Sequence, residues 1–163
     1  MFRTIVFPLK VTYRRMANIV LESFRACGGH CFCFVLPDGT NIPFPAEYEG
    51  APLHNKPILD AKSGILPGEF KLLYDYGDGW CFHIRFMRMV ETKKELPLLI
   101  KGQGYGIIDD IGGPYALMHY RQRQIEGSLD EEDMWIEGRL DDFDVALCQS
   151  SIRQPDSYDK LIF

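Results

Sequence analysis

The sequence lacks a long apolar run and lacks any segment that resembles an export signal. No stretch approaches the ~20 apolar residues that cross a bilayer. The apolar core and small-residue cleavage site of a secretory signal are missing from the opening residues MFRTIVFPLK. We therefore expect a cytoplasmic protein that makes no membrane contact.

Positive charge is also scarce. The chain has 18 Lys and Arg against 23 Asp and Glu, a net charge of −5 at pH 7, and residues 121–163 hold 5 basic and 11 acidic side chains. Nonspecific nucleic-acid binding depends on Lys and Arg that displace counterions from phosphates. Nucleic acid is thus a poor candidate partner. The sequence does not identify the partner, and it is compatible with a protein partner or with a second copy of this chain.

The five cysteines form an odd set in a chain without an export signal, which indicates reduced thiols. Residues 27–33, with His30 among three cysteines, resemble a metal-binding knuckle. They contain no C-x-x-C pair, however, and no second His/Cys pair of suitable spacing follows. Buried or half-buried thiols are the preferred interpretation, and the sequence assigns no metal.

Motifs of nucleotide cofactors and serine nucleophiles are missing as well. Gly102, Gly104 and Gly106 follow a G-x-G-x-G spacing, whereas a dinucleotide fingerprint needs G-x-G-x-x-G before a helix. Neither a Gly-Lys-Ser/Thr phosphate loop nor a G-x-S-x-G elbow occurs. The sequence therefore predicts no cofactor.

What the chain does contain fits one globular domain over residues 1–163. Its 163 residues, 46% of them hydrophobic, suffice for a sizeable core. Alternating and helical patterns predict an α+β fold: a mainly antiparallel sheet with an N-terminal helix, and C-terminal helices packed on one face. The expected strands are 2–13, 31–36, 69–76, 80–90 and 98–100; the expected helices are 17–27, 114–126 with Tyr115, Met118 and Ile125 buried, one from the capping box Ser128–Glu131 to near Gly138, and one capped by Asp144.

The clearest local signal is a β-hairpin around Gly77-Asp78-Gly79. A two-residue turn at Asp78-Gly79 would mix apolar and charged side chains on both faces. A three-residue loop gathers one apolar face, which a slip of one residue would destroy, and we choose it. This register pairs Tyr76 with Trp80, Tyr74 with Phe82 and Leu72 with Ile84.

Ionisable side chains lie on the other face of this predicted hairpin. Asp75 is opposite Cys81 and diagonal to His83, about 7–8 Å apart between backbones. Asp75, Asp78 and His83 are therefore candidate catalytic residues for metal-assisted hydrolysis, with His30 as a further candidate. The alternative is that Asp78 supplies turn hydrogen bonds while Asp75 and His83 form a solvated pair.

Two segments, LLYDYGDGWCFHIRF and KGQGYGIIDDIGGPYAL, resemble the plasmid pRiA4b ORF-3-like family. Its members carry a Y-D-[FY]-G-D-x-W signature and then a G-x-G…E-D-C-G-G-P segment. Weaker matches are a helix followed by H-L-x-x-F, with His30 as the histidine, and a late W…F-D at Trp135 and Phe143-Asp144. The residues that match the two signatures are Tyr74, Asp75, Tyr76, Gly77, Asp78, Trp80, Gly102, Gly104, Asp110, Gly112, Gly113 and Pro114.

The chain departs from the family pattern at two cysteine positions, which are Gly106 and Ile111 here. A cysteine metal site built from those two is therefore absent. The resemblance implies no settled activity: some members are labelled insertion-element passengers, or even resolvases. A serine recombinase needs a nucleophilic serine among clustered arginines, and this sequence does not supply one.

We predict a non-enzymatic binding or interaction domain, with a link to mobile elements suggested by the family labels. The reason is that most motif residues are Gly, Pro and aromatic types, which set backbone shape and packing. One alternative is a metal-dependent hydrolase that uses Asp75, Asp78 and His83; another is a nucleic-acid-associated protein, which the charge opposes. The candidate binding residues are Tyr74, Trp80, His30, Asp110, Gly112 and Gly113.

Overall fold

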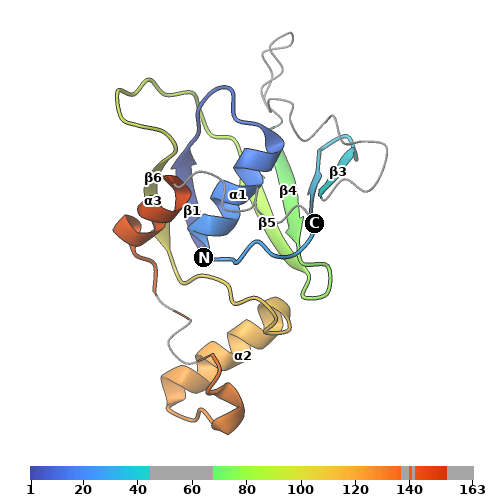
Figure 1. Cartoon of the computed structure of the whole chain (residues 1–163), viewed down its shortest axis with the longest axis vertical. Helices are drawn as coiled ribbons and strands as arrows, with labels where there is room; N and C mark the ends of the chain where they lie inside the picture. Colours follow the sequence, from blue (N-terminus) through green and yellow to red (C-terminus); the bar gives the residue numbers. More distant parts are fainter. Residues whose placement is uncertain (45–67, 137–139, 141, 154–163) are drawn as a thin grey trace.

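The chain folds as one α+β unit with two antiparallel sheets (Figure 1). The computed structural model describes residues 1–44, 68–136, 140 and 142–153. The smaller sheet pairs β1 (Phe2–Val6) with β6 (Leu98–Gln103). The larger sheet has the order β3-β2-β4-β5, and these strands span Asn41–Phe44, Phe32–Val35, Glu69–Tyr74 and Trp80–Arg85. The predicted fold class is confirmed.

Helix α1 (Tyr13–Ser23) is the centre of the core, because nine of its eleven residues are buried. It begins four residues before the predicted position and ends four residues before the predicted end. The side chain of Thr12 accepts a hydrogen bond from the Arg15 nitrogen at 3.2 Å, a helix N-cap that the apolar spacing did not reveal. At the other end Arg25 adopts a left-handed φ of 63°, so the helix stops before Gly28 is reached.

The β4–β5 hairpin has the predicted apolar face but not the predicted register. Tyr74 pairs with Trp80, so the loop has five residues, 75–79, rather than three. The reason lies in Asp75, whose φ is 50° and whose carbonyl accepts from the Gly79 nitrogen at 2.6 Å. Because the shift is two residues, each strand keeps its buried parity. Tyr76, however, leaves the face and is exposed.

The two predicted cross-strand neighbours of Asp75 are wrong for the same reason. Cys81 pairs with Leu73, and His83 pairs with Lys71 on the exposed side of the sheet. Asp75 itself lies in the loop and is buried.

Helix α2 (Gly113–Glu126) ends at the predicted residue and begins one residue earlier than predicted, and its predicted buried side is wrong. Leu117 and Tyr120 face the core, whereas Tyr115, Met118 and Ile125 are exposed. The sequence spacing allows two apolar stripes on this helix, and the stripe with Leu117 and Tyr120 faces the core. The helix lies at the lower end of the molecule in Figure 1.

The predicted helix after Ser128 is a single 3-10 turn, η2 (Glu131–Asp133). The Asp130 nitrogen donates to the Asp133 carboxylate at 3.1 Å, and the Asp133 nitrogen donates to the Asp130 carboxylate at 3.2 Å. These two hydrogen bonds close a single turn. Its predicted end at Gly138 lies outside the described residues. Asp144 caps α3 (Val145–Arg153) as predicted, through Leu147 nitrogen at 2.7 Å.

Helix α3 packs against α1 and β6 and so completes the core on that side. Within the described residues, no helix combines the length and apolar character that crossing a bilayer requires.

Candidate functional site

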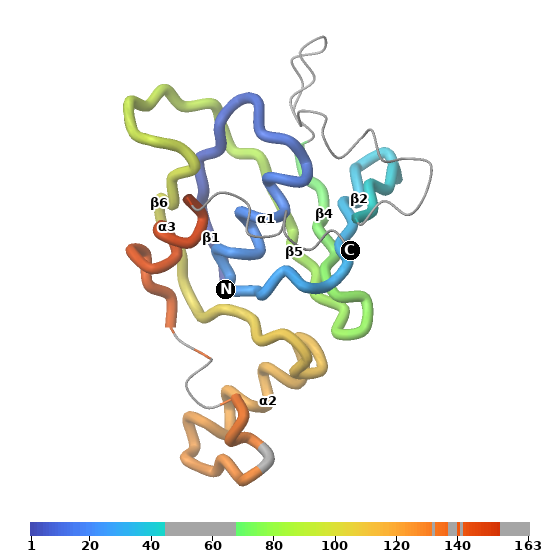
Figure 2. Tube along the Cα trace, in the orientation of Figure 1, coloured from blue at the N-terminus to red at the C-terminus, as the bar shows by residue number. Residues whose placement is uncertain are grey.

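Three loops that are far apart in the sequence meet below the larger sheet (Figure 2). They are residues 27–30 after α1, residues 74–79 from the last residue of β4 to the start of β5, and residues 109–113 before α2. We call this region the loop junction. Each pair of loops is joined by a hydrogen bond: Gly28 nitrogen donates to Tyr74, Gly112 nitrogen to Asp78, and Cys27 nitrogen to Asp109.

The Tyr74 hydroxyl makes the central hydrogen bonds of the loop junction. It donates to Asp109 Oδ1 at 2.5 Å and accepts from the Gly28 nitrogen at 3.0 Å. Asp109 Oδ2 accepts from the Cys27 nitrogen at 2.7 Å, so both oxygens of this carboxylate are used. Burial raises the pKa of the Tyr74 hydroxyl, and the hydrogen bond to Asp109 raises it further. The hydroxyl therefore remains a donor across the physiological pH range.

Removal of this hydroxyl tests how much its hydrogen bonds stabilise the fold. We expect Tyr74→Phe to lower the free energy of unfolding by about 1–3 kcal/mol, because Gly28 and Asp109 each lose a buried partner. Urea unfolding followed by circular dichroism measures the change. The matched control is Tyr115→Phe at an exposed tyrosine, for which we expect a change within about 0.5 kcal/mol. Equal effects of the two substitutions would contradict the role of Tyr74.

Asp78 connects the hairpin loop to the loop before α2 through a hydrogen bond. Its Oδ2 accepts from the Gly112 nitrogen at 3.2 Å. A Cβ added at Gly113 would lie well inside contact distance of the Asp78 carbonyl oxygen, so any side chain at position 113 would overlap that oxygen. The predicted turn hydrogen bonds come from the Asp75 carboxylate, whereas the Asp78 carboxylate makes a contact between loops.

The imidazole of His30 faces two carboxylates from the other two loops. His30 Nε2 lies 3.7 Å from Asp75 Oδ2 and 3.5 Å from Asp110 Oδ1. The other oxygen of Asp75 accepts from the nitrogens of Gly77 and Asp78, which orients the carboxylate toward His30. Asp75 is nearly buried, with 11% of its side chain exposed, whereas Asp110 is 76% exposed.

Both carboxylates are carried by strained backbone positions. Asp75 and Asp110 adopt φ values of 50° and 64°, in the left-handed region that non-glycine residues seldom occupy. Such residues cost about 1–3 kcal/mol each and cluster at functional sites. Arg25 has the same backbone conformation outside this cluster, so the convergence of both carboxylates on His30 is what distinguishes Asp75 and Asp110.

Two sets of ligand-type side chains therefore share His30. One is His30, Asp75 and Asp110, and the other adds Cys27 and Asp109 to His30; within each set the ligand atoms lie within 4.8 Å of one another. They are the sets of three that the described part of the chain offers. Asp109 is already hydrogen-bonded through both oxygens, which leaves the first set more accessible to an ion.

The site residues predicted from the sequence are partly brought together. Tyr74, Asp75, Asp78, His30, Asp110, Gly112 and Gly113 all belong to the junction. His83 does not, since it lies on the exposed face opposite Lys71. Trp80 is 2% exposed and belongs to the core.

The sequence reasoning missed Asp109 and Cys27 as members of the junction. Asp109 has the same residue type as Asp110 beside it, and only the three-dimensional contact with Tyr74 distinguishes the two.

Comparison with family models assigns the chain to one family. The family model described as plasmid pRiA4b ORF-3-like protein matches residues 1–151. An uncharacterized protein, y4hQ of Sinorhizobium fredii, is 26% identical over 122 residues, which are 72% of this chain and 62% of that protein. The chain therefore spans less than two thirds of that relative's length.

A solved structure shares the fold. The protein of unknown function MM3350 from Methanosarcina mazei Go1 matches with a TM-score of 0.68 and 18% sequence identity, over 88% of this chain and 86% of that one. At this identity the likeness establishes the arrangement of helices and strands and nothing about activity.

Proposed function

The chain belongs to the plasmid pRiA4b ORF-3-like family, and from the junction that its motif residues build we propose a binding domain for a divalent metal ion. The single observation that carries the proposal is the convergence of His30, Asp75 and Asp110. Each comes from a different loop, and their ligand atoms lie within 4.8 Å of one another.

The distances suit one ion. A tetrahedral ion with bonds of ~2.1 Å separates its ligand atoms by about 3.4 Å. The two distances from His30 Nε2 are 3.5 and 3.7 Å, so an ion fits between the three groups with small side-chain adjustments. Three protein ligands leave a fourth position open for water or for an atom of a partner.

The donor types favour a first-row transition metal. An imidazole nitrogen suits Zn²⁺, Cu²⁺, Fe²⁺ and Ni²⁺, whereas carboxylate oxygens alone suit Mg²⁺ and Ca²⁺. Two carboxylates with one imidazole give a neutral site when Zn²⁺ is bound and the imidazole is uncharged. We therefore expect Zn²⁺ to bind more tightly than Mn²⁺, and Mg²⁺ more weakly than both.

Binding is favoured over hydrolysis. The hydrolase hypothesis uses Asp75, Asp78 and His83, with His30 as a further candidate. Of these, His83 lies on another face, and the Asp78 carboxylate accepts a hydrogen bond from Gly112. The motif residues Tyr74, Gly112 and Gly113 make contacts between loops. The cytoplasmic location and the link to mobile elements stay predictions.

Isothermal titration of the full chain, produced without a histidine tag, tests the metal site. We expect one Zn²⁺ per chain. His30→Ala and Asp110→Asn should each weaken binding more than the ~10–100-fold that outer-shell substitutions cost. At a free concentration 100 times Kd, an ion that binds the folded chain alone adds about 2.7 kcal/mol of stability.

Two matched variants keep this assignment falsifiable. His83→Ala removes an exposed histidine outside the junction and should bind Zn²⁺ as the natural chain does. Cys27→Ser should also retain binding, because Cys27 belongs to the other set. Equal losses in His30→Ala and His83→Ala, or loss in Cys27→Ser, would overturn the proposal that His30, Asp75 and Asp110 hold the ion.

A further inference from the structure

A basic and apolar segment lies exposed between β5 and β6. We call residues 86–94 the strap; they carry three basic residues and one acidic residue. Met87 and Met89 are 74% and 56% exposed, and Phe86 and Val90 are exposed as well. Arg88 lies between these two methionines in the sequence. Within the described residues, its side chain makes no hydrogen bond or ion pair. Contiguous exposed apolar side chains are typical of interaction surfaces, and four of the five residues 86–90 are apolar and exposed.

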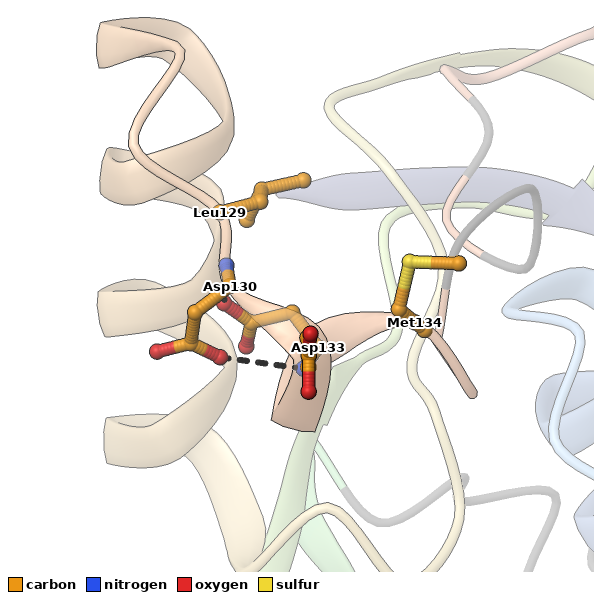
Figure 3. Close-up of a pocket in the computed structure, with 5 residues that line it drawn as sticks. Leu129, Asp130, Asp133 and Met134 are labelled. Atoms are coloured by element: carbon orange, nitrogen blue, oxygen red, sulfur yellow. Dashed lines mark hydrogen bonds between the residues drawn. The ribbon is translucent and has the colours of Figure 1, made fainter.

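An acidic and apolar segment lies at the opposite end of the molecule. We call residues 127–136, which follow α2, the arm; they carry four acidic residues and no basic one. A cavity of about 370 Å³ opens on the arm, lined by Leu129, Asp130, Glu131, Asp133 and Met134 (Figure 3). The strap is at the upper end and the arm at the lower end of the long axis in Figure 1, so one molecule cannot join its own two segments.

We infer that the strap of one molecule docks on the arm of a second copy of this chain. The chemistry matches on both counts: the methionines of the strap are apolar partners for Leu129 and Met134, and Arg88 is a charge partner for Glu131. Methionine adapts to irregular cavities, which suits an open pocket of this kind. The proposal uses no residue of the metal site and stands independently of it.

A strap-to-arm contact is heterologous, because the two surfaces differ. Repetition leaves one free strap and one free arm at the ends of every assembly, so the chain should form dimers and longer species as the concentration rises. Opposite charges are screened by salt, with a Debye length of about 10 Å at 0.1 M, so association should weaken as the salt concentration increases.

Charge reversal tests the contact in sedimentation velocity with the full chain. Arg88→Glu and Glu131→Lys should each weaken self-association at least ~10-fold, because like charges then face each other. The double variant that carries both substitutions restores opposite charges and should associate as the natural chain does. Lys10→Glu, at an exposed lysine outside both segments, is the matched control and should change nothing.

Two outcomes overturn the inference. One is a natural chain that stays monomeric at every concentration and salt level. A monomer that binds vesicles of anionic lipid in a co-sedimentation assay belongs to this outcome, because its strap would then bind lipid and not a second copy. The other is a double variant that associates no better than the single variants, since general destabilisation would not be rescued by a second reversal. Rescue by the double variant supports direct contact between strap and arm.

Discussion

Alanine at position 113 is expected to cost more than about 3 kcal/mol of folding free energy, in the range reached only by specific steric or backbone conflicts. Gly113 has a φ of 84°, and an added Cβ would overlap the Asp78 carbonyl oxygen and approach its carbon to 3.1 Å. The obstacle is backbone, which cannot turn aside as a flexible side chain can. The loop that carries Asp110 would have to move away from the hairpin loop.

Gly39→Ala is the matched control for this substitution. Gly39 has almost the same φ, 85°, but nothing lies within 4 Å of the added Cβ. The Gly39→Ala variant should lose only the cost of a left-handed alanine, about 1–2 kcal/mol. Urea unfolding of both variants then isolates the overlap with Asp78. Equal losses would mean that Gly113 is not packed against the hairpin loop.

Alanine in place of Trp80 is the second large effect, with an expected loss of about 3–5 kcal/mol, the cost of emptying a large core position. Trp80 is 2% exposed and pairs with Tyr74 at the end of the hairpin. Its place in the core therefore also holds the strand that leads into Asp75.

The second tryptophan of the chain is the control for Trp80. Trp135 is 49% exposed, so Trp135→Ala should cost about 1 kcal/mol or less. Thermal and urea unfolding measure both. If Trp80→Ala left stability unchanged, the residue would be a surface platform for a ligand and the assignment to the core would be wrong.

The strand faces were predictable from the sequence, but the hairpin loop was not. Alternation fixes which side chains of β4 and β5 are buried, and Phe82 and Leu72 are buried as expected. Loop length depends on Asp75, whose left-handed backbone is stabilised by its own carboxylate and carbonyl. Nothing in an alternating pattern reports such a local hydrogen-bonded turn.

The members of the site were predictable one by one, but their grouping was not. His30, Asp75 and Asp110 were singled out by residue type and by resemblance to family motifs. Their convergence depends on how α1, the hairpin and the segment before α2 pack, which is a tertiary property. The same limit explains the error with His83, whose position relative to Asp75 changed with the register of β5.

A crystal of the natural chain soaked in Zn²⁺, measured at the zinc absorption edge, tests the central claim most directly. We predict an anomalous peak at about 2.0–2.2 Å from His30 Nε2, Asp75 Oδ2 and Asp110 Oδ1, the bond lengths of zinc to nitrogen and oxygen ligands. A peak at Cys81 or His83 with none at the junction, or no peak on this chain at all, would contradict the account.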